Sequence, residues 1–239
     1  YLYAYNKLEI TMILLFDVDG TLTPSRGLMD PDFKQFFKKL PNFSLVTGSD
    51  LPKTIEQVGL DIFNLAEYSF NCSGNDVYRY GMPVAKNNWK PSTELMDYLE
   101  QCLADSNYTK RFGHHFEVRT GMLNFSVVGR DAVGDQRTQY YDWDCVFHER
   151  EHIAQGVQER FPDICAQVGG ETGIDIYPQG CDKSQVLKYF HGQPIHFFGD
   201  RCEPGGNDYS VANRLSNRST CRVSHVKNWT ETWQLLQEK

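Results

Sequence analysis

Short apolar runs and helical repeats alternate along the first 70 residues of this chain. Three apolar runs predict strands, at residues 14–16, 43–46 and 68–70. Between them, apolar side chains recur at helical spacing and predict helices at residues 32–40 and 51–58. Gly59 ends the second helical repeat, and Ser49 or Asp50 could cap its start. This alternation predicts a parallel sheet with helices on its faces.

The pattern changes after Gly81 and changes back near Gly180. In this middle part, we predict helices at residues 94–103 and 147–161, and strands at 116–118, 123–127 and 173–177. This mixture is typical of an α+β unit built on an antiparallel sheet. Alternation then returns, with a helix at 184–190, a strand at 195–198 and a final helix at 229–237. The fold class is therefore α/β: a Rossmann-like parallel-sheet core, residues 1–80 and 182–239, with an inserted domain at 81–181.

Composition and charge exclude some partners. Hydrophobic residues make up 40% of the 239 residues and charged residues 23%, as in ordinary globular proteins. The net charge of −7 argues against a nucleic-acid partner, although local arginines could still hold a small anion. No apolar run approaches the roughly 18 residues of a membrane span, so we expect no membrane partner and a cytoplasmic location. The seven cysteines include no CxxC pair and are expected to be free thiols. The first eleven residues carry no motif and are expected to be an extension without function.

Polar groups suited to one reaction follow the predicted core strands. Ligands of open parallel sheets bind outside the carboxyl ends of the strands. The polar groups found there are Asp17-Val-Asp19, Thr47-Gly-Ser49, Gly199-Asp200 and Gly205-Gly-Asn-Asp208, with Asp182-Lys183 opening the helix after the insert. An isolated DxD is more often a turn or cap, and an isolated GGND is more often a loop. Together and in this order they favour one active site.

These groups fit phosphoryl transfer. Asp17 and Asp200 are candidate ligands of Mg²⁺, which prefers carboxylate oxygens, water and substrate phosphate. Asp17 is also a candidate nucleophile, and Lys183 and Ser49 could neutralise charge around the attacked phosphorus. An extended backbone would send Asp19 away from Asp17, but a turn could bring it over the leaving oxygen as general acid and base.

DVDGT, a downstream Ser and Lys, and GD…GGND resemble the haloacid dehalogenase superfamily of phosphotransferases. The resemblance implies that Asp17 becomes an aspartyl-phosphate, that Asp19 is the acid and base, and that Mg²⁺ is required. It also implies that Asp19 lends its backbone carbonyl to the metal, with Asp208 as a further candidate ligand. The insert resembles the large cap domain of one branch of this superfamily.

Three arginines in the insert bear on the substrate. Arg119, Arg130 and Arg137 flank apolar strands. Any one alone would more simply be surface charge, but the trio suits an anionic group held bidentately. The core already handles one phosphate, so a second site implies a substrate that carries two phosphates at some stage. A phosphomutase needs such a site and a simple phosphatase does not.

The stretch RTGMLNFSVVGR, with DGTLTPSR, GSDLPKTIEQVG, GIDIYPQGCDK and FFGDRCEPGGND, is similar to eukaryotic phosphomannomutases from Met12 to about Asp208. The resemblance implies interconversion of mannose 6-phosphate and mannose 1-phosphate, with a hexose 1,6-bisphosphate as intermediate and activator, feeding GDP-mannose synthesis. It also implies a homodimer formed through the caps. The substrate-binding residues carried over by motif are Arg26 from the core and Arg119, Asn124, Arg130, Arg137, Gly173 and Asp175 from the cap.

Two departures and two alternatives stay open. Gly173 stands where the family usually has Ser, so a hydroxyl contact to phosphate is lost unless backbone N–H groups serve. Residues 209–219 are poorer in acids than in relatives, which leaves a second cation site in doubt. One alternative is a sugar-phosphate phosphatase, in which water attacks the aspartyl-phosphate; another is a non-catalytic sugar-phosphate sensor. The arginine trio argues against the first, and the intact catalytic groups argue against the second.

Overall fold

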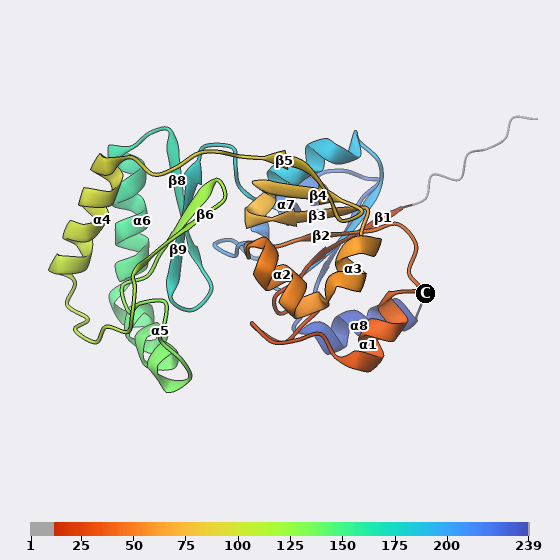
Figure 1. Ribbon diagram of the computed structural model, residues 1–239, viewed down its shortest axis with the longest axis horizontal. Helices are drawn as coiled ribbons and strands as arrows, with labels where there is room; N and C mark the ends of the chain where they lie inside the picture. Colours follow the sequence, from red (N-terminus) through yellow and green to blue (C-terminus); the bar gives the residue numbers. More distant parts are fainter. Residues whose placement is uncertain (1–11, 239) are drawn as a thin grey trace, which may run out of the picture.

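The structure is a computed structural model that describes residues 12–238. The expected N-terminal extension, residues 1–11, lies outside the described residues. Figure 1 shows two lobes, one built on a seven-stranded sheet and the other on a four-stranded sheet. We call them the core lobe and the cap lobe. None of the helices within residues 12–238 is long and apolar enough to cross a membrane.

The core sheet has the strand order β11-β10-β1-β2-β3-β4-β5. Its strands are β1 (Ile13–Asp17), β2 (Phe43–Val46), β3 (Tyr68–Asn71), β4 (Asp76–Arg79), β5 (Met82–Lys86), β10 (Ile195–Gly199) and β11 (Arg222–His225). Strands β11, β10, β1, β2 and β3 are parallel, which confirms the predicted parallel sheet. Strands β4 and β5 add an antiparallel hairpin. In register, Phe16 lies beside Phe198 and Asp17 beside Val46. The segments that follow β1, β2 and β10 therefore leave the sheet on the same side, at the carboxyl-terminal ends of these strands.

Helices cover both faces of the core sheet. On one face lie α1 (Pro31–Phe37), α2 (Leu51–Val58), α3 (Leu60–Leu65) and α8 (Trp229–Gln237), and on the other α7 (Tyr209–Ser216) and the 3-10 helix η2 (Lys183–Phe190). A short 3-10 turn, η1 (Cys72–Gly74), follows β3. Helix α1 starts where Asp30 accepts hydrogen bonds from two backbone N–H groups and Pro31 fills the first turn. Its buried Phe37 then packs against Phe16 of β1, and its buried Phe33 packs against Phe37.

The cap sheet is antiparallel, with the order β6-β7-β9-β8. Its elements are β6 (Phe116–Arg119), β7 (Met122–Phe125), β8 (Ile164–Gly169), β9 (Gly173–Pro178), α4 (Thr93–Asp105), α5 (Asp135–Phe147) and α6 (Glu149–Arg160). Helices α4 and α6 cover the face turned away from the core lobe (Figure 1). Leu99, Phe125 and Val157 are buried in the layer between them and the sheet. The other face of this sheet is left to the core lobe.

The structure departs from the sequence-based outline at helix α5 and at the first domain boundary. Helix α5 was not predicted, because its polar and aromatic residues show no apolar stripe, and His148 separates it from α6 with a left-handed φ of 54°. The proposed boundary between residues 80 and 81 falls in the turn between β4 and β5, and the core sheet continues to Lys86. The seven cysteines are free, as predicted.

Candidate active site

One cavity of about 640 Å³ is lined by residues of both lobes. Most of the site residues predicted from the sequence line it: Asp17, Asp19, Arg26, Ser49, Arg119, Asn124, Arg130, Arg137, Gly173, Asp175 and Asp200. The two exceptions, Lys183 and Asp208, lie in the core wall. Lys183 forms ion pairs with Asp17 and with Asp208. The cavity therefore brings together residues that lie far apart along the chain.

Asp17, Lys183 and Asp208 form a buried ionic group at the end of β1. Lys183 Nζ lies 2.5 Å from Asp17 Oδ1 and 2.6 Å from Asp208 Oδ1, and all three residues are at most 3% exposed. Burial alone would lower the pKa of Lys183, but the two carboxylates outweigh it and raise that pKa above its ordinary value. The ammonium therefore stays protonated and fixes Asp17 in place.

Three carboxylates near the carboxyl-terminal ends of the core strands could bind a divalent cation. Asp17, Asp200 and Asp208 each offer a carboxylate oxygen, and these atoms lie within 4.8 Å of one another. Asp17 Oδ2 is buried and has no protein partner. Burial raises the pKa of Asp17 well above its ordinary value, and the charge of Asp208 adds to this. Burial and Asp208 likewise raise the pKa of Asp200, to about 6. An all-oxygen donor set with uncompensated negative charge suits Mg²⁺.

Asp19 is brought over the cavity by a tight turn. Gly20 adopts a φ of +89°, and a Cβ there would overlap the carboxylate of Asp200, so glycine is required. Asp19 Oδ1 accepts hydrogen bonds from the backbone N–H of Arg26 and, at 3.0 Å, from Gln57 Nε2. The buried Gln57 side chain also donates to Thr23 within the same turn. Asp19 and Asp17 therefore line the same cavity, as the proposed acid and base role requires.

Two of the cap arginines share one carboxylate. Arg119 donates to Glu117 through Nε at 2.9 Å and Nη2 at 3.0 Å, and Arg130 Nε donates to Glu117 Oε2 at 2.7 Å. Burial would raise the pKa of Glu117, but the two guanidinium groups outweigh it and lower that pKa to about 2. Glu117 is thus a permanent anion that fixes the direction of both side chains.

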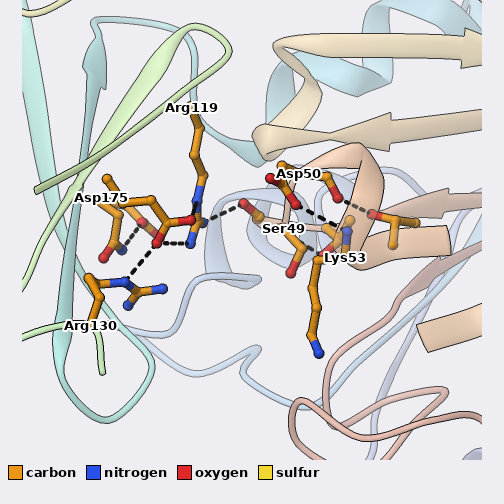
Figure 2. Close-up of polar contacts among 11 residues, drawn as sticks. Ser49, Asp50, Lys53, Arg119, Arg130 and Asp175 are labelled. Atoms are coloured by element: carbon orange, nitrogen blue, oxygen red, sulfur yellow. Dashed lines mark hydrogen bonds and ion pairs between the residues drawn. The ribbon is translucent and has the colours of Figure 1, made fainter. Parts of the chain in front are cut away.

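Arg119 also joins the two lobes. Its Nη1 donates to the carbonyl oxygen of Gly48 at 2.9 Å, in the loop after β2. Figure 2 shows Arg119 reaching from the cap lobe toward the Ser49 segment, with Arg130 and Asp175 beside it and Lys53 on the core side. The predicted cap site and the predicted core loop are therefore in direct contact.

The remaining predicted cap residues lie on β7, α5 and β9. Asn124 Nδ2 donates to Asp175 Oδ1 at 2.6 Å across the paired strands β7 and β9. A Cβ at Gly173 would come within 2.8 Å of Asn124 Nδ2, so a larger residue would displace this amide. The absence of a side chain at Gly173 therefore leaves the space that the Asn124 amide occupies. Arg137 Nε donates to Glu171 Oε2 at 2.8 Å.

A sequence profile described as "Eukaryotic phosphomannomutase" matches residues 31–238, most of the chain. The chain belongs to the eukaryotic phosphomannomutase family. A phosphomannomutase of Saccharomyces cerevisiae is 34% identical over 223 residues, with 87% of each chain covered. A phosphomannomutase of Dendrobium officinale is 35% identical over 212 residues, with 84% of each chain covered.

A solved structure supports the fold of this phosphomannomutase-family chain. The C-terminal domain of trehalose-6-phosphate phosphatase from C. albicans aligns with a TM-score of 0.64 and 14% identity, covering 95% of this chain and 91% of that one. At this identity the likeness concerns the fold alone. It agrees with the predicted class, a parallel-sheet core of the haloacid dehalogenase type with an inserted cap.

Three cavity-region residues of this phosphomannomutase-family protein were not singled out from the sequence. Glu117 could have been found, because it lies two residues before Arg119 on a strand and so shares its face. Gln57 lies on helix α2 and Glu171 in a loop, each more than 30 residues from its partner. Nothing in the local sequence marks either residue.

Proposed function

We propose that this chain interconverts mannose 6-phosphate and mannose 1-phosphate through an aspartyl-phosphate and a hexose 1,6-bisphosphate. One observation carries the proposal: a single cavity has a buried carboxylate, Asp17, in its core wall and three arginines in its cap wall. A bisphosphate placed in it would offer one phosphate to each wall. Membership of the phosphomannomutase family supports the same reaction.

In the proposed first step, Asp17 transfers a phosphoryl group. In its phosphorylated form, a carboxylate oxygen of Asp17 is bonded to phosphorus, and this bond breaks as a hydroxyl of the hexose monophosphate attacks. Asp19 takes the proton of that hydroxyl and a bisphosphate forms. Asp17 later attacks the other phosphate of the bisphosphate, and Asp19 returns the proton to the leaving sugar oxygen. Gln57 and the N–H of Arg26 hold Asp19 for both steps.

The core wall would carry the charge of the transferred group. Asp17 and Asp200, the backbone carbonyl of Asp19, and Asp208 as a further candidate would hold Mg²⁺, which when bound neutralises phosphate charge. Lys183 keeps Asp17 oriented through its Oδ1 contact. Ser49 lines the cavity, and in this proposal its hydroxyl would contact the same phosphate.

The cap wall would hold the phosphate that is not being transferred. Arg130 and Arg137 each use Nε to bind a carboxylate. Their terminal nitrogens make no hydrogen bond to protein within the described residues and can meet phosphate oxygens bidentately. Arg26 lines the cavity from the core, and Asn124, Gly173 and Asp175 line it from the cap.

The experiment uses phosphorus NMR. The protein is incubated with mannose 6-phosphate, Mg²⁺ and a trace of hexose 1,6-bisphosphate. A growing mannose 1-phosphate resonance is the expected result, and it disappears in Asp17→Asn. Inorganic phosphate as the sole product would overturn the mutase in favour of the phosphatase, because water would then be the acceptor. Repeating the assay with a chelator tests the proposed need for Mg²⁺.

We also propose a homodimer formed through the caps, a cytoplasmic location and a role in supplying mannose 1-phosphate for GDP-mannose synthesis. The family resemblance supports these three proposals. Sedimentation equilibrium of the full chain tests the first of them, and a monomer at micromolar concentration contradicts it.

A further inference from the structure

Arg137 is held differently from the other two cap arginines. Its partner Glu171 lies in the loop between β8 and β9, and the contact is one hydrogen bond of 2.8 Å from Nε to Oε2. The Glu171 side chain is 46% exposed, whereas that of Arg137 is 16% exposed. Both residues line the cavity. An exposed carboxylate therefore occupies one side of a guanidinium that faces the proposed distal phosphate.

Glu117 shows what a permanent structural carboxylate looks like in the same cavity. It receives three hydrogen bonds from two arginines, and its side chain is 30% exposed. Glu171 has a single ion pair among the contacts described for residues 12–238. Because the Glu171 carboxylate is 46% exposed, this pair is weaker and more strongly screened by salt than a fully buried pair. Glu171 is thus placed to be exchanged for a stronger anion, whereas Glu117 is not.

A phosphate at Arg137 changes the balance at this contact. A dianion can bind both terminal nitrogens of the guanidinium and carries twice the charge of a carboxylate. The Glu171 carboxylate, left beside it, repels it. Glu171 lies in the loop of residues 170–172, between Gly169 and Gly173, which pair at the ends of β8 and β9, and a Cβ at Gly170 would meet no atom within 4 Å. The Glu171 side chain is itself 46% exposed, so it can leave Arg137 by turning toward solvent.

We propose that Glu171 is a built-in competitor for the distal phosphate: it binds Arg137 when no phosphate is there and weakens phosphate binding when one arrives. This inference rests on the proposed function. In that reaction the bisphosphate must leave the cap arginines, turn round and bind again. A carboxylate that takes Arg137 back lowers the free energy needed for that release.

The test compares Glu171→Gln with Glu159→Gln. Gln keeps the size of the side chain and can still accept from Arg137 Nε, so only the charge is removed. Glu159 lies on α6, and its only described hydrogen bond is to Gln155 on the same helix, so its substitution removes an equal charge elsewhere in the cap. Binding of mannose 6-phosphate is measured by calorimetry without Mg²⁺ and without bisphosphate, so that nothing reacts.

We expect Kd to fall about tenfold in Glu171→Gln, with the difference shrinking as salt is raised, and to stay unchanged in Glu159→Gln. An unchanged Kd in both variants overturns the inference. A higher Kd in Glu171→Gln than in the wild type also overturns it, because Glu171 would then be orienting Arg137 for phosphate binding. Phosphorus NMR on the wild type, after Mg²⁺ and a trace of hexose 1,6-bisphosphate are added, separates the two hypotheses: tight binding without interconversion refutes the proposed function and leaves the comparison of Kd values intact.

Discussion

Substituting Asp200 by Asn should have opposite effects on stability with and without Mg²⁺. Asp200 lies with Asp17 and Asp208 at the edge of the core sheet, and their mutual repulsion is only partly offset by Lys183. Burial and the charge of Asp208 raise the pKa of Asp200 from 3.8 to about 6. Ionising this carboxyl therefore costs more in the folded protein than in the unfolded chain.

Linkage between protonation and folding gives the direction in which the free energy of unfolding changes with pH. Because the folded pKa is raised, the stability that Asp200 contributes is fully present below pH 3.8 and is lost as the pH rises through about 6. The shift of roughly two units corresponds to about 3 kcal/mol in the free energy of unfolding, as an upper value. For a chain of this length, this is about 6–12 °C in Tm. In the presence of a chelator at pH 7.5, Asp200→Asn should unfold at the higher temperature.

Mg²⁺ should reverse this order. The wild type gains about 4.1 kcal/mol when the free ion exceeds its Kd a thousandfold, which is more than the roughly 3 kcal/mol lost in its absence, whereas the variant lacks one carboxylate ligand and gains less. Thermal unfolding followed by circular dichroism, from pH 4.5 to 8 with chelator or MgCl₂, measures both effects. Asp97→Asn on the exposed side of α4 is the control for loss of one charge.

Three results would refute this reasoning. If Asp200→Asn unfolds below the wild type in chelator at pH 7.5, the three carboxylates do not destabilise the metal-free site. If MgCl₂ raises the Tm of both proteins equally, Asp200 is not a ligand. An equal response to pH in the wild type and in Asp200→Asn would locate the titration elsewhere.

Three further predictions concern single contacts. Lys183→Met should cost about 3–5 kcal/mol in urea unfolding, because it leaves two buried carboxylates unpaired; a loss below 1 kcal/mol contradicts the ion pairs. Glu117→Gln should raise KM for mannose 6-phosphate about tenfold and lower kcat less, since the arginines lose their orientation; an unchanged KM counts against this role. Gln57→Leu should lower kcat about tenfold and shift the pH profile of kcat, because Asp19 loses a hydrogen bond; a fall in kcat with an unchanged profile would show a merely structural role.

The strand and helix pattern could be predicted well where one periodicity dominates. The buried strand before Asp17 and the helix that starts after Asp50 both lie where the sequence places them. Helix α5 was missed because its surface mixes acidic, amide and aromatic side chains, and tertiary packing of Tyr140 and Trp143 stabilises it instead. Local propensity carries no record of such contacts.

The candidate site, like the fold, has some features that the sequence predicts and others that only the tertiary structure decides. From the sequence by itself follow the kinds of groups and the strand ends that carry them, because Asp17, Ser49 and Asp200 each follow a recognisable apolar run. These residues already indicate phosphoryl transfer at one edge of a parallel sheet. Which partner holds each group was decided only by the tertiary structure. Gln57 holds Asp19 and Glu171 holds Arg137 across 38 and 34 residues, and burial of the two apolar cores, not any local pattern, brings these pairs together.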